Sequence, residues 1–289
     1  MQSLWMVAAS LLFAGMGVCV KLGSAQFSAA ELVFYRGAIA LLILYAYVSL
    51  AGLTLATRHW RTHVARGLAG FISVVLYFQS IGMIPLAMAV TLNETALLFL
   101  AVLLVRWQRE RISLRLLLVL AAGFAGVVLL LRPSWHSEQL AGGLFGLGSA
   151  IAASIAYLNV RTLGELGEPE WRTVFYFSLI AALGGLLWIL VGSQTGQPVH
   201  AIDAGGWQLL LGVGGCGALA QLCMTRAYKY GNTMVGASLS YSTVVFASWF
   251  GIWLWDERLP LIAQLGVAMI VVSGILATTL ARAAPVEQD

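Results

Sequence analysis

The sequence predicts an all-α integral membrane protein with ten transmembrane helices, arranged as two inverted five-helix repeats. Three observations lead to this fold class. Hydrophobic residues make up 60% of the 289 residues and charged residues only 10%, whereas a soluble domain carries about 25% charged residues. Ten apolar stretches of roughly membrane-spanning length follow one another. The second half of the chain also repeats a pattern of the first.

The ten predicted spans are separated by short connections. They cover residues 4–20, 32–50, 67–84, 86–105, 112–131, 141–160, 173–192, 207–225, 233–255 and 261–281. Their residues lack the strict alternation of outer-membrane strands, so we expect helices. All six prolines fall between spans or at their ends, where a missing backbone N–H does least harm. We therefore predict a single membrane unit with no soluble domain appended.

The Lys and Arg residues indicate how the spans are oriented. If the N-terminus is cytoplasmic and all ten spans cross, twelve of the sixteen basic residues lie on the cytoplasmic side. The twelve are Arg58, Arg61, Arg66, Arg106, Arg109, Arg111, Arg115, Arg161, Arg172, Arg226, Lys229 and Arg282. Because cytoplasmic loops carry an excess of positive charge, we predict that both termini are cytoplasmic. The net charge of +4 then reflects topology and requires no nucleic-acid partner.

The internal repeat has an offset near 147 residues. The stretch "LNETALLFLAVLLVRWQRER" (92–111) aligns with "LSYSTVVFASWFGIWLWDER" (239–258), and both end in Glu-Arg. Each half contains five spans, so the second half must enter the membrane in the opposite sense. Secondary transporters use this arrangement, with the substrate site near the midplane between the halves. We predict one repeat over 1–135, a second over 136–282 and a cytoplasmic tail over 283–289.

Several stretches resemble a known family when they are taken together with the ten-span repeat. They are "VFYRGAIALLIL", "IGMIPLAMAVTLNETALLF", "GFAGVVLLLRP" and "AYKYGNTMVGASLSYSTVVFASWFGIWLWDE". With them the chain resembles the drug/metabolite transporter superfamily, as a ten-helix EamA-type member. The resemblance implies transport of small metabolites through a central cavity, often outward, and no particular substrate. The chain departs from the family pattern at Glu94 and Leu97, where an aromatic or small residue and then a proline are usual, and at Arg109.

Glu94 is the strongest candidate for a functional residue. It follows Pro85 by nine positions, which places it roughly 13 Å along a helix and near the middle of a hydrocarbon core about 30 Å thick. Ionisable residues at this depth usually face a cavity and mark a transport pathway. There Glu94 can couple transport to protons or attract an amine. The alternative is a protonated side chain hydrogen-bonded to a neighbouring helix, without a transport role.

The repeat aligns Glu94 with Tyr241 and Asn93 with Ser240. Both clusters lie about eight residues inside their spans, counted from opposite sides, so we expect them to converge at similar depth. An acid, an amide, hydroxyls and an aromatic face suit a small polar or zwitterionic solute. The alternative is hydrogen bonding between helices, which such residues also provide.

Other polar and aromatic residues within spans are further candidates for the cavity wall. They are Arg36, Tyr77, Gln79, Tyr157, Asn159, Tyr176, Gln221 and Trp249. Arg36 is either an interfacial anchor, a partner for a substrate carboxylate or a counter-ion of Glu94. Trp249 and Trp253 share a helix face, where packing or anchoring at the membrane interface is the alternative to binding an aromatic group.

These residues favour a secondary active transporter of amino acids, amines or related metabolites, an exporter that works by alternating access. Its predicted partners are a small-molecule substrate, the lipid bilayer and protons. The resemblance implies a bacterial cytoplasmic (inner) membrane. A facilitative exchanger or uniporter is one alternative, and a lipid-moving or sensory protein is another. We expect no cofactor, no metal and no enzymatic activity, because no second acid accompanies Glu94 within a span. The oligomeric state stays open, and a monomer is compatible with the sequence.

Overall fold

The computed structural model describes residues 4–108, 114–131, 137–194, 199–230 and 239–282, and this part of the chain contains eleven helices and no strand. In chain order they are α1 (Leu4–Gly23), α2 (Ala29–Leu50), α3 (Trp60–Met83), α4 (Leu86–Glu94), α5 (Ala96–Gln108), α6 (Leu114–Leu131), α7 (Ser137–Glu165), α8 (Glu170–Gln194), α9 (Ala204–Tyr230), α11 (Ser242–Trp255) and α12 (Leu261–Arg282). The helices follow the ten predicted spans, with α4 and α5 sharing the fourth. They confirm the all-helical fold class.

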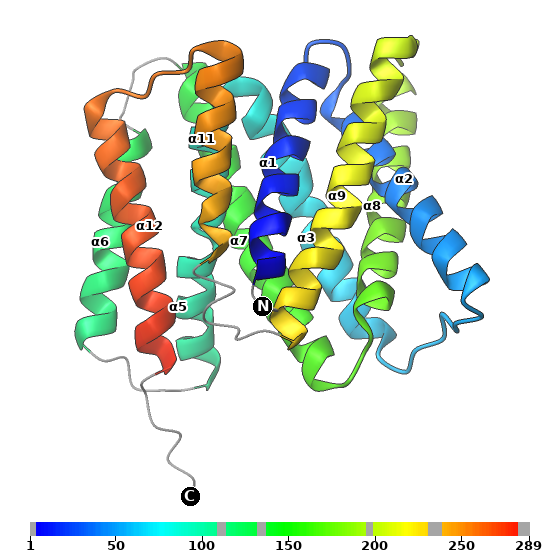
Figure 1. The fold of residues 1–289 in the computed structure, drawn as a ribbon, viewed down its shortest axis with the longest axis horizontal. Coiled ribbons are helices and arrows are strands. Elements are labelled where there is room, and N and C mark those ends of the chain that lie inside the picture. Colours follow the sequence, from blue (N-terminus) through cyan, green and yellow to red (C-terminus); the bar gives the residue numbers. More distant parts are fainter. Residues whose placement is uncertain (1–3, 109–113, 132–136, 195–198, 231–238, 283–289) are drawn as a thin grey trace, which may run out of the picture.

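Six of these helices are long and apolar enough to cross a membrane, namely α1, α2, α3, α7, α8 and α9. Each has at least 20 residues, which corresponds to about 30 Å of helix. The first residue of α1 and the last residue of α12 lie at the same end of the molecule (Figure 1). An even number of crossings accounts for that placement.

The two halves of the chain are interleaved and do not form separate bundles. The most extensive helix contacts are those of α3 with α7, α6 with α12, α1 with α9 and α2 with α8. Each of these pairs joins a helix of the first half to a helix of the second. Figure 1 shows α6 and α12 side by side at one edge and α2 near α8 at the other.

Small residues allow the closest of these contacts. A Cβ added at Gly37 in α2 would overlap the backbone of Ala182 in α8, and one added at Gly185 in α8 would overlap the backbone of Phe34. The α2 and α8 backbones therefore touch through reciprocal glycines, as is typical of helix pairs in membranes.

The fourth and ninth spans are interrupted at Thr95 and Tyr241, within one position of equivalence in the repeat, whereas the sequence predicts continuous helices over 86–105 and 233–255. α4 ends at Glu94 and α5 begins at Ala96. The Thr95 hydroxyl donates to the Leu92 carbonyl, and the Ser242 hydroxyl donates to the Leu239 carbonyl, both at 2.6 Å. These hydroxyls compete with the helical backbone for its acceptors. Residues 233–238 of the ninth span lie outside the described part.

Candidate solute-binding site

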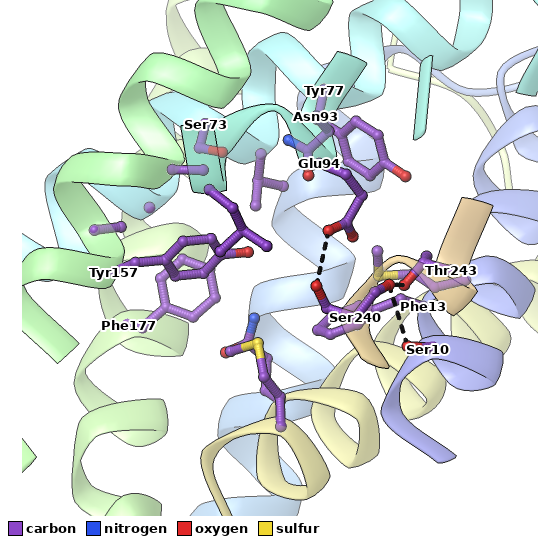
Figure 2. A pocket seen from close by; sticks show the side chains of 18 of the residues that line it. Ser10, Phe13, Ser73, Tyr77, Asn93, Glu94, Tyr157, Phe177, Ser240 and Thr243 are labelled. Carbon is purple, nitrogen blue, oxygen red and sulfur yellow. Dashed lines mark hydrogen bonds between the residues drawn. The ribbon is translucent and has the colours of Figure 1, made fainter. Parts of the chain in front are cut away.

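A polar pocket lies between the two halves, where the interrupted helices meet α1, α2, α3, α7, α8 and α9. Its volume is about 90 Å³, below the roughly 300–1,000 Å³ of pockets that enclose a drug-sized ligand. Figure 2 shows side chains from both halves facing this space. In this conformation it admits part of a metabolite, and a larger solute requires the walls to move apart.

One wall is formed where the two helix interruptions meet. The Ser240 hydroxyl donates to Glu94 Oε2 at 3.2 Å, and Figure 2 shows the Glu94 carboxyl directed toward Ser240. Next to it, Asn93 Nδ2 donates to Ser149 Oγ at 2.5 Å. Thr243 completes this wall, and its hydroxyl donates to the Ser240 carbonyl at 2.6 Å. Glu94 is the last residue of α4, so the interruption holds it at this point.

The other wall carries two arginines over one aromatic ring. The guanidinium carbons of Arg36 and Arg66 lie 5.0 and 3.9 Å from the centre of the Phe177 ring. Both side chains are buried, and both line the pocket. Arg66 Nη2 donates to Gln221 Oε1 at 3.3 Å. The pocket therefore has an acidic side and a basic side.

Seven of the predicted site residues line this pocket. They are Arg36, Tyr77, Asn93, Glu94, Tyr157, Gln221 and Ser240. The convergence expected from the repeat is present, because Glu94 of the first half contacts Ser240 of the second.

Four other predicted residues lie outside the pocket lining. The Asn159 amide donates to the Ile155 carbonyl of its own helix at 2.8 Å, and the Tyr176 hydroxyl donates to the Leu55 carbonyl at 3.0 Å. Gln79 lies two positions beyond Tyr77, and residues with that spacing do not share a helix face. Trp249 is 57% exposed and stacks on Trp253 with ring centroids 5.8 Å apart. Its side chain faces the surroundings of the protein.

Tyr241 also differs from its expected position. Its side chain is 1% exposed, and a Cβ added at Gly274 of α12 would overlap the phenol ring. The turn before α11 thus directs Tyr241 toward α12 and leaves Ser240 and Thr243 facing the pocket. The repeat places the right segment at the pocket, but not the right side chain.

Arg66 is the most important site residue that the sequence interpretation missed. Hydropathy starts the third span at residue 67 and places Arg66 in a cytoplasmic connection, whereas α3 begins at Trp60 and buries Arg66. Gly67 and Gly70 beside it indicate close helix contact and were the available signal. Phe177 and Thr243 carried no comparable signal, since Phe and Thr are ordinary residues of membrane helices.

Outside the pocket, an ion pair joins three helices at the end where α1 finishes. Lys21 Nζ pairs with the Glu257 carboxylate and also donates to the Ile84 carbonyl at 3.3 Å. Glu257 Oε2 accepts from the Leu86 N–H at 2.9 Å, at the start of α4. Arg258, the neighbour of Glu257 in the sequence, pairs with Asp256.

A second polar cluster lies at the opposite end, where α7 connects to α8. The Glu168 carboxylate accepts from Thr57 Oγ1 at 2.5 Å and from Arg172 Nη1 at 2.7 Å, and His63 Nε2 lies 3.5 Å away. Burial by itself raises the pKa of the Glu168 carboxyl, but the Thr57 and Arg172 hydrogen bonds and the Arg172 charge outweigh it and lower the pKa below its usual value. Among the described residues, no group of three or more His, Cys, Asp or Glu side chains is placed to bind a metal.

Comparison with known proteins identifies this architecture. The profile of the EamA-like transporter family matches residues 1–132 and 140–279. The chain belongs to the EamA-like transporter family. This confirms the resemblance drawn from the sequence and makes the protein a multi-pass membrane transporter.

Among the relatives of this EamA-like transporter is the pseudopaline exporter CntI of Pseudomonas aeruginosa, 31% identical over 93% of both chains. An uncharacterized transporter of Helicobacter pylori is 28% identical over 93% of this chain and 91% of its own. A riboflavin transporter of Vibrio cholerae is 26% identical over 94% and 90%. A crystal structure with 20% identity superposes with a TM-score of 0.71 over 98% of both chains, which supports the fold alone.

Proposed function

We propose that this EamA-like transporter is a secondary active exporter of small polar metabolites in a bacterial inner membrane. The pocket between the two helix interruptions is its solute site. The contact of Ser240 with Glu94, at 3.2 Å, is the observation that carries this proposal. It joins two residues that are one position apart in the repeat alignment, at the point where transporters built from inverted repeats bind their solutes with interrupted helices.

The position of the pocket along the helices supports loading from the cytoplasm. Its lining includes Met6 near the start of α1 and Met224 near the end of α9. With both termini cytoplasmic, as the basic residues predict, these positions belong to the cytoplasmic half. Toward the opposite end, the buried Val20, Leu86 and Val90 belong to one apolar cluster, next to the Lys21–Glu257 ion pair, whose carboxylate also accepts from the Leu86 N–H. Export requires this packed end to open after the solute has bound.

One relative is a pseudopaline exporter, which supports outward movement, and another is a riboflavin transporter, which supports a small metabolite as the solute. For this chain, Glu94 is also the proposed proton-coupling group, because it is the one acidic side chain in the described pocket lining. A solute and a proton that compete for the same carboxylate provide a direct form of antiport. We assign no enzymatic activity to the pocket.

The decisive test is counterflow in liposomes that contain the purified full-length protein, with a panel of amino acids, amines and organic acids. We expect saturable exchange of at least one solute, and acceleration by an inward proton gradient. Glu94→Gln should abolish the acceleration. The matched control is Glu165→Gln, which changes an exposed acid paired with Arg161 at 2.9 Å. Lipid scrambling without solute exchange contradicts the transporter assignment, and an unchanged gradient response in Glu94→Gln contradicts coupling through Glu94.

A further inference from the structure

The basic wall of the pocket contains two buried charges that no described acidic residue neutralises. Arg36 and Arg66 are 4% and 3% exposed. Within the described part of the chain, neither guanidinium forms an ion pair with a carboxylate. A buried charge costs several kcal/mol unless it is paired, so an unpaired arginine at this depth indicates a functional site.

The neutral partners of the two arginines leave donors free. Arg66 Nη2 reaches Gln221, but Arg66 Nε and Nη1 are buried and have no hydrogen-bond partner. Arg36 Nε contacts the Met16 sulfur at 3.5 Å, and a thioether is a weak acceptor. The Phe177 ring stabilises both cations through its face and offers no acceptor oxygen. An anionic group in the pocket would fill this vacancy with charge-assisted hydrogen bonds.

Three ionisable side chains set the charge of the described pocket lining: Arg36, Arg66 and Glu94. Two cations and one carboxylate match a solute with two carboxylates and one ammonium group. Figure 2 shows Phe177, the ring that both arginines contact, on one side of the pocket and Glu94 with Ser240 on the other. A solute that spans the pocket would thus meet cations at one end and the acid at the other.

We propose that Arg36, Arg66 and Phe177 form a carboxylate-binding subsite, and that the transported solutes are amino dicarboxylates. This inference rests on the proposed transport function. The two guanidiniums bind the carboxylates, because the fork of N–H donors matches carboxylate geometry. Glu94 and Ser240 bind the ammonium group. Tyr77 and Tyr157, which also line the pocket, contact the carbon chain between the charged ends.

The wild-type protein provides the first test, because it needs no variant that might fail to fold. The reference probe is L-glutamate. Three further probes each change one of its charged groups: L-glutamine, glutarate and O-phospho-L-serine. Inhibition of counterflow and protection against thermal unfolding are measured for each. We expect L-glutamate to act at a concentration about tenfold lower than L-glutamine, which lacks one carboxylate, and than glutarate, which lacks the ammonium group. Stronger action of O-phospho-L-serine than of L-glutamate overturns the carboxylate assignment in favour of phosphate.

Variants then assign the preference to the arginines. Arg66→Gln and Arg36→Gln should each lose the preference for L-glutamate over L-glutamine, and Arg66→Lys should retain part of it because the charge remains. The control is Arg161→Gln, which changes a half-exposed arginine outside the pocket. Transport of neutral or cationic solutes without this preference overturns the subsite while the proposed function stands. If no solute moves in any assay, the proposed function fails and the inference fails with it.

Discussion

The protein contains two kinds of buried or partly buried charge, and they differ in whether the described part of the chain supplies the partner. At the two ends, Lys21 pairs with Glu257 and Arg172 pairs with Glu168. In the pocket, Arg36 and Arg66 contact an amide, a thioether and an aromatic face, and no carboxylate of the described residues pairs with them. The desolvation cost of the first kind is offset within the fold. The cost of the second kind remains, and a bound solute can offset it.

This difference separates stability from transport. Lys21 and Glu257 are 236 residues apart, and Glu168 also accepts from Thr57, 111 residues away. The loss of these contacts should therefore weaken the folded state. The pocket charges connect little, so their loss should change binding and leave the folded state intact. Substitutions at the two kinds of site therefore test whether the paired charges act on stability and the pocket charges on binding.

The largest loss of stability is expected for Glu257→Gln. This change leaves the Lys21 ammonium without its counter-ion and weakens the cap on the Leu86 N–H. Breaking a buried pair costs about 3–5 kcal/mol, and the partial exposure of both side chains reduces the expected loss to about 2–3 kcal/mol. Thermal unfolding in detergent, followed by tryptophan fluorescence, measures it.

The control for this prediction is Asp256→Asn. Asp256 pairs with Arg258 at 3.0 Å, but both side chains are at least 75% exposed, and exposed pairs contribute about 0–1 kcal/mol. Equal melting temperatures for the two variants would show that the Lys21–Glu257 pair does not hold the helices together.

A smaller effect of the opposite sign is expected for Arg66→Gln. The substitution removes a buried charge that has no ionic partner, and the loss of its contact with Phe177 partly cancels that gain. The melting temperature should equal or slightly exceed that of the wild type. The corresponding gain in free energy of unfolding should be about 1 kcal/mol at most. A drop as large as that of Glu257→Gln would mean that Arg66 is a structural residue.

The smallest effect is expected for the pH dependence of stability at Glu168. Its hydrogen bonds lower the pKa in the folded protein, so folding favours the ionised form. The stabilisation is complete above the unfolded-state pKa, about 4.3, and is lost as the pH falls through the lower folded-state pKa. Melting curves between pH 3 and 7, compared with those of Glu168→Gln, should show a steeper acid loss in the wild type. Parallel curves would exclude a contribution from Glu168.

The sequence predicts the depth of the site better than the direction of its side chains. An inverted repeat brings equivalent positions to the same depth, so the alignment predicts the contact of Glu94 with Ser240 to within one residue. The rotation of each helix depends on packing that appears only in three dimensions. Tyr241 turns toward the gap left by Gly274 for that reason.

Hydropathy also hides the basic wall. Arg66 lies in the second turn of α3. An arginine lowers the average hydropathy there, so the predicted span begins after it, although the helix itself begins six residues earlier. The interruptions at Thr95 and Tyr241 are equally hidden, because a hydroxyl that donates to a backbone carbonyl, as in Thr95 and Ser242, barely changes the apolar character of a span. Hydrophobicity therefore predicts where the spans lie, and charge and hydrogen bonding determine the site residues and the helix interruptions within them.

The interrupted fourth span also affects the order in which the molecule is completed during its synthesis. α4 and α5 have 9 and 13 residues, or roughly 14 and 20 Å, so neither crosses a bilayer core alone. Ser149 follows Asn93 by 56 residues, and Ser240 follows Glu94 by 146. The ribosome thus synthesises the interrupted fourth span long before the side chains that bind to it. Asn93 and Glu94 therefore lack these partners until the second half has been made. Ser240 and Thr243, the last pocket residues in chain order, complete the pocket.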